Sequence, residues 1–283
     1  MKKFIFILLL FAISCTENKE KNPKKAPVSL SAKTNLLSII HGGWVKQEYV
    51  DSIIKTKSPY RSNKQYLSNV ELIIDTANLT GDTVMNPACF SNGKESFYFK
   101  IVIKQDSLNK PSMQMVYNHN YMNMDFFLEY SISAGDTILY MVKKDLINGE
   151  IKSKIPYKRI YNNPSVNYYV DPTTVFLNRT LITGKYKLYD AKNRLISNKV
   201  EFKEAGQVEG FSSFKNFYLE SYYGSANSQN YNFDYIVLSA PEKRSVYRWT
   251  LKKDIFKFYD IIPDGNKADM EHFKFTFKKD ILE

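Results

Sequence analysis

Apolar and polar side chains alternate with a period of two along much of the chain. In Phe97–Ile103 the Phe and Ile residues fall on one face and the Tyr, Lys and Val residues on the other, and Phe273–Phe277 alternates Phe with Lys and Thr. This period is that of a β-strand with one buried face. Further segments with strand character are Val70–Ile74, Met113–Tyr117, Phe126–Ile132, Thr137–Val142, Lys185–Tyr189, Val200–Phe202, Phe217–Glu220, Tyr235–Leu238, Val246–Leu251 and Ile255–Tyr259. The chain is therefore predicted to be all-β.

Short turns separate the predicted strands. Glycine-containing turn sequences lie at Thr80–Asp82, Asn92–Gly93, Ala134–Asp136, Ala205–Gly206 and Asp264–Gly265. Many antiparallel strands joined by short turns predict a sandwich or an up-and-down barrel, and a closed barrel has no exposed sheet edge. One short helix is predicted near the start of this region, at Glu48–Lys55, where Tyr49 and Ile53 form an apolar stripe.

The two halves of the chain begin alike. Ile40–Trp44 and Ile182–Tyr186 share the pattern apolar-x-Gly-x-aromatic about half a chain length apart, and each precedes a series of predicted strands. Pro and Asn residues interrupt the strand pattern between them, at 161–175. We therefore expect two tandem units, at 36–160 and 176–283, joined by a linker at 161–175.

The opening of the first unit resembles that of a lipocalin. Lipocalins begin with Gly-x-Trp at the head of eight antiparallel strands, and here Gly42–Trp44 is followed by predicted strands up to Tyr157–Arg159. The second unit, which opens with Gly184–Tyr186, is similar to small lipocalin-like lipoprotein domains of Bacteroidetes. The resemblance implies two antiparallel barrels in tandem. A generic β-sandwich is the alternative.

The resemblance also implies roles for three side chains. In lipocalins the Trp closes the barrel floor, and a basic residue of the last strand packs across it. Trp44 is therefore expected to be buried at a closed end, with Arg159 as its cation–π partner. Tyr186 has the equivalent role in the second unit, and Lys274 and Lys278 are its candidate partners.

The first fifteen residues have the features of an export signal. Lys2 and Lys3 precede an apolar run, Phe4–Ile13, that is too short to span a bilayer as a helix. Because Cys15 follows this run and Ser14 directly, the segment resembles the lipobox of bacterial lipoproteins, in which the cysteine is acylated after removal of residues 1–14. A departure from that pattern is Ala12, which stands where such boxes prefer Leu.

The lipobox resemblance implies a location in the bacterial cell envelope. Thr16 stands where Asp would be typical of inner-membrane retention, so we expect an outer-membrane lipoprotein, facing either the periplasm or the medium. The polar segment that follows Cys15 contains many lysines and two prolines and is predicted to be a flexible lipidated tether over 15–35. The predicted partner is the membrane, through the lipid anchor, and no protein partner is predicted.

Charge narrows the classes of ligand. The formal charge is +11, and it falls to +9 once Lys2 and Lys3 leave with the signal. The positive excess is spread along the chain without a basic helix or a known reader motif, which indicates mainly solvated strand faces, so nucleic-acid binding is not expected and attraction to anionic lipid or polysaccharide is kept as an alternative. With Cys15 acylated, Cys89 stands alone. No intramolecular disulfide is then possible, and Cys89 is expected to be a small buried apolar residue.

The sequence contains no pattern that nominates catalytic residues, a metal site or a cofactor. His41, His119 and His272 lie far apart, and there is no Gly-x-Ser-x-Gly elbow or phosphate-binding glycine loop. We therefore expect a protein that is not an enzyme. A carboxylate-dependent hydrolase stays open as an alternative because the chain has many carboxylates; those nearest the strands of the second half are Glu201, Glu204, Glu220 and Asp234.

Five hydroxyl residues fall in the sequence Asp-Ser/Thr-apolar, which Bacteroidetes glycosylate on exported proteins. These candidate O-glycosylation sites are Ser52, Thr76, Thr83, Ser107 and Thr137. The same sequence is also typical of a turn that leads into a strand.

The expected function follows from the predicted barrels. A small barrel holds one ligand when its inward side chains leave room, so the first expectation is an anchored lipoprotein that binds a small apolar or amphipathic molecule or a glycan. The alternative is a barrel filled by its own Phe and Tyr side chains, which would act as a scaffold or interaction module of an envelope complex. The ligand-binding residues cannot be named from the sequence.

Overall fold

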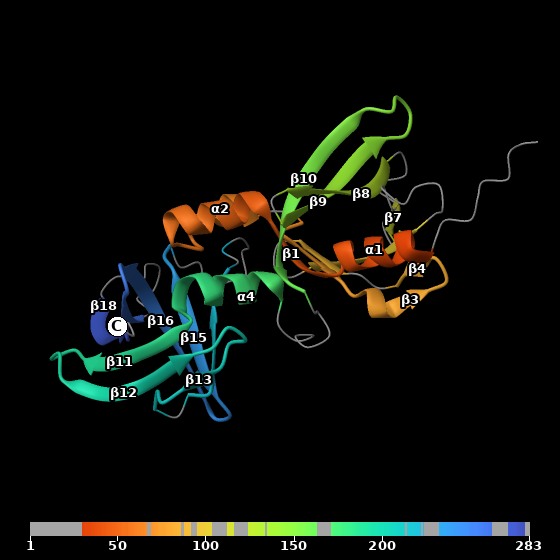
Figure 1. Cartoon of the computed structure of the whole chain (residues 1–283). Helices are drawn as coiled ribbons and strands as arrows, with labels where there is room; N and C mark the ends of the chain where they lie inside the picture. Colours follow the sequence, from red (N-terminus) through yellow and green to blue (C-terminus); the bar gives the residue numbers. More distant parts are fainter. Residues whose placement is uncertain are drawn as a thin grey trace, which may run out of the picture.

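In the computed structural model, the chain forms two antiparallel β-sheets joined by short helices (Figure 1). The structure describes residues 30–283 except 67–68, 86–87, 92–94, 104–111, 116–123, 134, 163–170, 213, 222, 224–231, 262–270 and 281–283. The predicted signal and most of the predicted tether, with Cys15, therefore lie outside the described residues. No described strand of one sheet pairs with a strand of the other.

Eight strands of the first sheet are hydrogen-bonded in a ring. Each strand pairs with the next in chain order, and the last pairs back with the first. These strands are β1 (Gly42–Lys46), β2 (Glu71–Ile74), β5 (Ala88–Ser91), β6 (Glu95–Val102), β7 (Ser112–Met115), β8 (Met124–Ser133), β9 (Asp136–Asp145) and β10 (Ile151–Tyr161). A small hairpin of β3 (Leu79–Thr80) and β4 (Thr83–Val84) is added at β6.

The second sheet is a nearly closed eight-stranded antiparallel barrel. Its strands are β11 (Gly184–Asp190), β12 (Leu195–Phe202), β13 (Val208–Glu209), β14 (Asn216–Leu219), β15 (Tyr235–Ala240), β16 (Lys243–Lys252), β17 (Ile255–Ile261) and β18 (Glu271–Lys279). Neighbours in the chain pair with each other, and β18 pairs back with β11. Between β13 and β14 the connection is a single bridge, Gln207 to Asn216, beside a backbone hydrogen bond from Val208 N to Lys215 O of 2.9 Å.

The period-two pattern of the sequence matches the observed strands. Each predicted strand segment overlaps a strand of the structure, so these predictions are confirmed. On β6 and just after it, Phe99, Ile101 and Ile103 are all buried, as one face of an alternating strand requires. Strands β3, β4 and β13 were not predicted, because two residues cannot establish a period, and neither β1 nor β5 was among the predicted segments.

The structure contains more helix than the single predicted segment. Helix α2 (Gln47–Thr56) lies at the place of the segment Glu48–Lys55, and three further helices are α1 (Leu30–Ile40), α3 (Asn63–Tyr66) and α4 (Pro172–Leu177). A 3-10 turn, η1 (Thr76–Asn78), follows β2, and a π-helical turn, η3 (Asn178–Ile182), continues α4.

Two boundaries differ from the predicted ones. Helix α1 begins at Leu30, inside the predicted tether 15–35, because the apolar residues Leu36 and Ile40 are buried in the core of the first sheet. The predicted linker 161–175 is also too wide. Strand β10 extends to Tyr161, and α4 begins at Pro172, where Asp171 accepts a hydrogen bond from Thr174 N as the N-cap of that helix.

Trp44 is buried in the first sheet against the end of α1. Its indole is fully buried, and Nε1 donates to the Ile40 carbonyl at the end of α1 over 2.9 Å. Arg159, its register partner on β10, places its guanidinium 4.6 Å from the centre of the Trp44 ring and also donates to the Ile39 carbonyl. The structure thus brings Trp44 and Arg159 together, with the cation at the negative end of a helix.

Tyr186 occupies the equivalent position in the second sheet. Its ring is buried, and its hydroxyl donates to the Ile182 carbonyl at the end of η3 over 2.8 Å. The basic partner in register is Lys279, so the predicted partners Lys274 and Lys278 are wrong. Lys274 pairs with Asp260, and Lys278 lies over the Tyr189 ring. Lys278 pairs in register with Lys187, so its side chain lies on the opposite face of β18 from that of Lys279.

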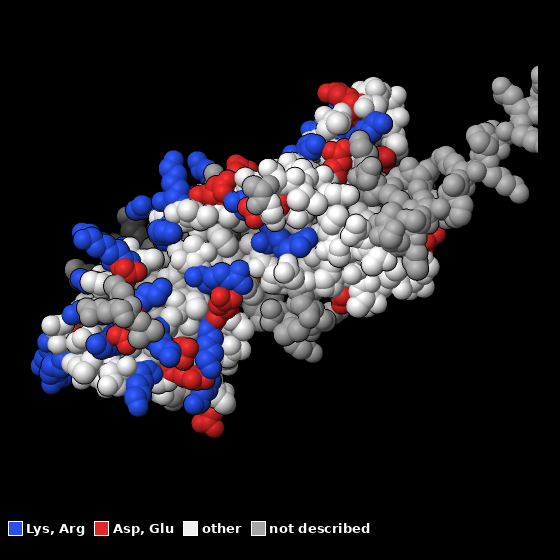
Figure 2. Space-filling model, in the orientation of Figure 1, with Lys and Arg blue, Asp and Glu red and all other residues white. Residues whose placement is uncertain are grey.

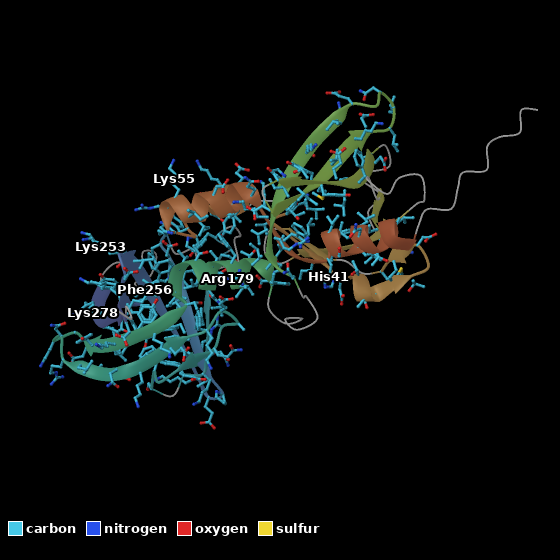
Figure 3. All side chains as sticks on the ribbon, in the orientation of Figure 1. His41, Lys55, Arg179, Lys253, Phe256 and Lys278 are labelled. Atoms are coloured by element: carbon cyan, nitrogen blue, oxygen red, sulfur yellow. The ribbon has the colours of Figure 1, made fainter. Side chains whose placement is uncertain are left out.

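Aromatic side chains fill the interior of the second sheet. Phe277 lies 4.6 Å from Phe258, 5.1 Å from Phe211 and 5.5 Å from Phe202, measured between ring centres. Most of these contacts are edge-to-face, which is a favoured geometry for aromatic pairs. Figure 3 labels Phe256 in the same interior, where it contacts Tyr186. The alternation of Phe and Tyr along the strands therefore builds a packed core here.

One hydrophobic cluster crosses from the first sheet into the second. It joins Tyr49, Val50 and Ile53 on the buried face of α2 with Phe176 on α4 and with the aromatic interior of the second sheet. Arg179, which lies at this junction in Figure 3, donates to the Ile160 carbonyl of β10 and to the Glu204 carboxylate of the second unit, each over 2.9 Å. The junction is thus packed by apolar side chains and bridged by an arginine.

We expect Trp44→Ala to lower the free energy of unfolding by about 3–5 kcal/mol, because it removes a buried aromatic side chain and the surface on which Arg159 packs. The measurement is chemical denaturation followed by far-ultraviolet circular dichroism. Tyr218→Ala is the matched control, since Tyr218 is 38% exposed. Equal stability of the two variants would contradict the closing role of Trp44.

Candidate functional site

A polar cleft opens where the end of α2 meets the second sheet. It has a volume of about 260 Å³ and takes its two walls from segments far apart in the sequence. One wall is the turn that follows α2, and the other combines the segment before β15 with part of β16. The lining residues are Thr56, Lys57, Ser58, Tyr60, Arg61, Asn232, Phe233, Asp234, Arg248, Trp249, Thr250 and Leu251.

The first wall is built by the way α2 ends. Lys57 adopts a left-handed backbone conformation with φ of 54°, and its N–H donates to the Ile53 carbonyl over 2.8 Å. The next residues, Ser58 and Pro59, cannot continue the helix. Ser58 Oγ instead accepts from Arg61 N over 3.1 Å, which holds the turn and places Arg61 at the cleft.

Asp234 fastens the two walls to each other. Its carboxylate accepts from Ser58 Oγ over 2.5 Å and from Tyr60 N over 2.7 Å, while its backbone carbonyl accepts from Trp249 N over 3.0 Å. Burial raises the pKa of Asp234, and the hydrogen bonds from Ser58 and Tyr60 and the charge of Arg61 oppose that rise. The only carboxylate in the lining is thus already engaged by the protein itself.

Basic side chains dominate the charge of the cleft. Lys57 and Arg61 come from the first wall and Arg248 from the second. The Arg248 guanidinium lies 5.2 Å from the centre of the Phe233 ring, a cation–π distance that presents a flat cationic surface. Three cations against one hydrogen-bonded carboxylate favour an anionic ligand. On the face drawn in Figure 2, Lys and Arg side chains are also concentrated over the second sheet.

A second cluster, a pair of carboxyl groups, lies behind α4. Glu71 on β2 is 3% exposed and forms a side-chain hydrogen bond with Asp171, the N-cap of α4. Glu71 Oε2 accepts from Thr173 N over 2.9 Å, and Asp171 accepts from both the N–H and the hydroxyl of Thr174 over 2.6 and 2.8 Å. The pair links the first sheet to the helix at the junction.

Burial sets the protonation of this pair. Desolvation and the neighbouring charge of Asp171 raise the pKa of Glu71 well above its usual value. Burial also raises the pKa of Asp171, although its hydrogen bonds from Thr174 act in the opposite direction. Burial and the proximity of the two carboxyl groups therefore oppose ionisation of both members of the pair at once. Burial and the two carboxyl groups also raise the pKa of nearby Tyr161.

The predicted glycosylation sites fall in different surroundings. Ser52 lies on α2, where its hydroxyl donates to Ser62 Oγ over 2.8 Å. Thr76 lies on η1, and its Oγ1 is 3.1 Å from Nδ1 of His41. Thr83 is on β4 and Thr137 on β9, both half-buried. Ser107 lies outside the described residues. The structure does not bring these five residues into one site.

The other residues considered from the sequence are also dispersed. His272 is exposed on β18, far from His41 along the chain, and His119 is not among the described residues. Glu204 pairs with Arg179, and Glu220 accepts from the Tyr235 hydroxyl over 3.0 Å. Within the described ranges there is no group of three or more His, Cys, Asp or Glu residues placed to hold a metal ion. Cys89 lies on β5.

Comparisons with known proteins give no match. Family models, curated protein sequences and solved structures were each searched, and none matches this chain. Among the residues that the structure describes, no helix has the length and apolar character needed to cross a membrane.

The basic side chains of the cleft could not be found from the sequence. Arg61 follows a helix stop and Arg248 lies on a strand, and only folding brings them to one cavity. Asp234 was considered as one of several carboxylates near the second-half strands. The single local indication was the Ser58–Pro59 helix stop, which predicts a turn but does not predict what packs against it.

Stability should depend on pH through the carboxyl pair. Because the pKa of Glu71 is higher in the folded than in the unfolded chain, the folded state binds the proton more tightly. Its contribution to stability is full below the unfolded pKa, near 4.3 for glutamate, and is lost as the pH rises through the folded value. Glu71→Gln replaces the titratable carboxyl group by an amide that can still form hydrogen bonds. We therefore expect the stability of this variant to change less with pH than that of the unmodified chain.

The measurement is the denaturation midpoint at intervals between pH 4 and pH 8. Glu242→Gln is the control, because Glu242 lies exposed in the turn between β15 and β16. Parallel profiles for the unmodified chain and Glu71→Gln would show that the pair does not hold a proton at the junction.

Proposed function

We propose that this chain is a non-enzymatic lipoprotein of the bacterial outer membrane that binds an anionic glycan in the cleft between two tandem lipocalin-like barrels. The observation on which this depends is the cleft itself. Lys57, Arg61 and Arg248 surround one cavity in which the sole carboxylate, that of Asp234, already accepts two hydrogen bonds. A bound anion would therefore meet a lining with three basic side chains and one carboxylate.

The cleft is a better ligand site than the interior of the second sheet. Phe202, Phe211, Phe258 and Phe277 are buried against one another there, and a ligand would have to displace them. The cleft, in contrast, opens to solvent. Ligand recognition at the junction of two units is also common, since two surfaces supply different groups to one ligand.

An acidic sugar fits the chemistry of the lining. Arginine guanidinium groups pair with carboxylates or phosphates through two parallel hydrogen bonds, which suits Arg61 and Arg248. The Phe233 ring offers an apolar face to a sugar ring, and Thr56, Asn232 and Thr250 supply hydroxyl and amide groups for sugar hydroxyls. The volume of about 260 Å³ is at the lower end for ligand pockets and suits one sugar unit of a chain.

Matching ends of the two sheets support the tandem lipocalin-like interpretation. Both Trp44 and Tyr186 donate to a carbonyl four residues earlier, at the end of a helical segment. Each also faces a basic residue on the last strand of its own sheet, Arg159 or Lys279. Each set of eight strands follows chain order around the sheet. Both proposed units thus combine a buried aromatic residue on the first strand with a basic residue on the last strand.

Arg61→Glu should weaken the binding of an acidic oligosaccharide by about 10- to 100-fold, because a charge-assisted hydrogen bond contributes about 1.5–3 kcal/mol. The measurement is calorimetric titration with oligogalacturonate, with a neutral cello-oligosaccharide for comparison. Arg244→Glu makes the same change of charge outside the cleft lining, where Arg244 contacts the Tyr218 hydroxyl.

Three results would contradict the glycan proposal. One is equal loss of binding in the Arg61 and Arg244 variants, which would indicate only a general effect of charge. Another is equal affinity for the acidic and the neutral oligosaccharide. The third is the absence of binding to either by the unmodified chain.

Cys15→Ala should release the protein from the membrane fraction while the fold is retained, because the proposed anchor is covalent and several acyl chains are needed for stable attachment. Fractionation at high salt, followed by circular dichroism of the released protein, measures both effects. The matched control is Cys89→Ala, which leaves the proposed anchor in place. Persistent membrane association of Cys15→Ala in high salt would contradict the lipoprotein proposal.

A further inference from the structure

The hairpin of β9 and β10 projects from the first sheet and ends in apolar side chains. In Figure 1 its strands extend beyond the rest of the sheet, and in Figure 2 its tip stands clear of the molecule. Ile147 at the tip is 80% exposed, the highest value among the large apolar side chains that the structure describes. Leu146 and Ile151 beside it are 59% and 55% exposed. Three large apolar side chains thus face solvent at one turn.

The backbone of this turn is satisfied by its own residues. Asp145 Oδ1 accepts from Ile147 N over 2.8 Å, and the Asp145 carbonyl accepts from Gly149 N over 3.0 Å. Glu150 N donates to Asn148 Oδ1 over 2.9 Å, and the Glu150 carbonyl accepts from Asp145 N over 2.8 Å. These N–H groups would therefore keep their hydrogen bonds if the tip were transferred from water to an apolar medium. Such satisfaction of backbone groups is required for entry into an apolar medium.

The charges behind the tip are compensated by basic residues. Lys152 lies 2.6 Å from the Glu150 carboxylate and 4.0 Å from that of Asp145. Lys154 forms an ion pair of 2.7 Å with Glu129 further from the tip. An apolar end followed by lysines and paired carboxylates is suited to the boundary between acyl chains and headgroups, where lysine side chains reach towards the headgroups.

We propose that the tip of the β9–β10 hairpin inserts Leu146 and Ile147 into the surface of the bilayer that holds the protein. This inference deepens the proposed function, because it assumes the same membrane that the Cys15 anchor would enter. The hairpin is a second contact that fixes how the anchored protein is oriented on that membrane.

The length of chain before the first sheet favours the membrane as the occupant. Fourteen residues separate Cys15 from Leu30, where α1 begins, and a chain of that length reaches at most about 50 Å. Helix α1 packs on the same sheet that carries the hairpin. The anchor therefore keeps this unit near the bilayer. In Figure 1 the hairpin also points away from the second unit, which leaves its tip free to meet a flat surface.

The β11–β12 hairpin provides a matched control. Leu195 and Ile196 lie just after its turn and are 57% and 53% exposed, similar to Leu146. This hairpin belongs to the second unit and lies at the opposite end of the molecule in Figure 1. Both ends cannot lie on one flat bilayer at the same time. If exposure of apolar side chains alone decided which hairpin inserts into the bilayer, the two hairpins would insert equally. The proposed orientation places only the β9–β10 hairpin in the bilayer.

The test compares a polarity-sensitive fluorescent label at Ile147→Cys with the same label at Ile196→Cys in the full chain. The labelled protein is incorporated into vesicles of phosphatidylethanolamine and phosphatidylglycerol that contain spin-labelled lipid. We expect the emission at position 147 to fall about twofold or more, because the tip would lie in the outer 5–10 Å of the bilayer. The label at position 196 should keep its emission. The unmodified chain measures any labelling of its own cysteines.

A second preparation separates the hairpin from the lipid anchor. A chain with a histidine tag directly before Thr16 is captured on vesicles with nickel-chelating lipid, which holds it at the surface without acylation. Quenching at 147 but not at 196 in this preparation supports the hairpin proposal even if the full chain fails to float with vesicles and the anchor is refuted. Equal quenching at the two positions, or none at 147 on vesicles that hold the protein, overturns it.

Discussion

Burial of the apolar face of α2 against the second sheet fixes the geometry of the candidate site. Tyr49, Val50 and Ile53 are each at most 3% exposed and belong to the same cluster as the second interior. Fully burying one such side chain contributes about 1.5–3 kcal/mol. Because this contact sets where α2 lies, it also sets where the helix ends, and the turn that follows the helix meets Asp234. The cleft therefore depends on apolar packing that none of its charged residues provides.

The sequence predicts the strands well and the helices poorly, for a physical reason. A strand with one buried face has a period of two that persists over five to ten residues, and Phe97–Ile103 or Val246–Leu251 display it directly. Helices α3 and α4 have only four and six residues, too few for a helical period. Such short helices depend on tertiary contacts and caps, such as Asp171 at the start of α4.

Pairing of residues across strands was predicted in one unit and not in the other. The register that places Arg159 opposite Trp44 agrees with the position expected from the resemblance, whereas Tyr186 faces Lys279 in place of Lys274 or Lys278. Alternation predicts the strand but not which residue of its neighbour lies opposite, and Lys279 shares a face of β18 that Lys274 and Lys278 do not. The cleft is harder still to predict, because Arg61 follows α2 and Arg248 lies on β16, and only the packing of α2 on the second sheet brings them together.

The glycines that open the two units have a consequence for how sequences with this architecture can diverge. Gly42 and Gly184 have φ of 135° and 143°, and a Cβ would lie 2.6 Å from the Tyr161 carbonyl oxygen or 2.8 Å from Lys279 Cε. A side chain at Gly42 would collide with backbone, the Lys279 side chain near Gly184 can move aside, and the positive φ at both positions favours glycine. Most strand positions require only an apolar or a polar residue. The requirement for glycine at these two positions is therefore stricter than the requirement at most strand positions, so a chain could change most of its strand residues and still close each sheet in this way.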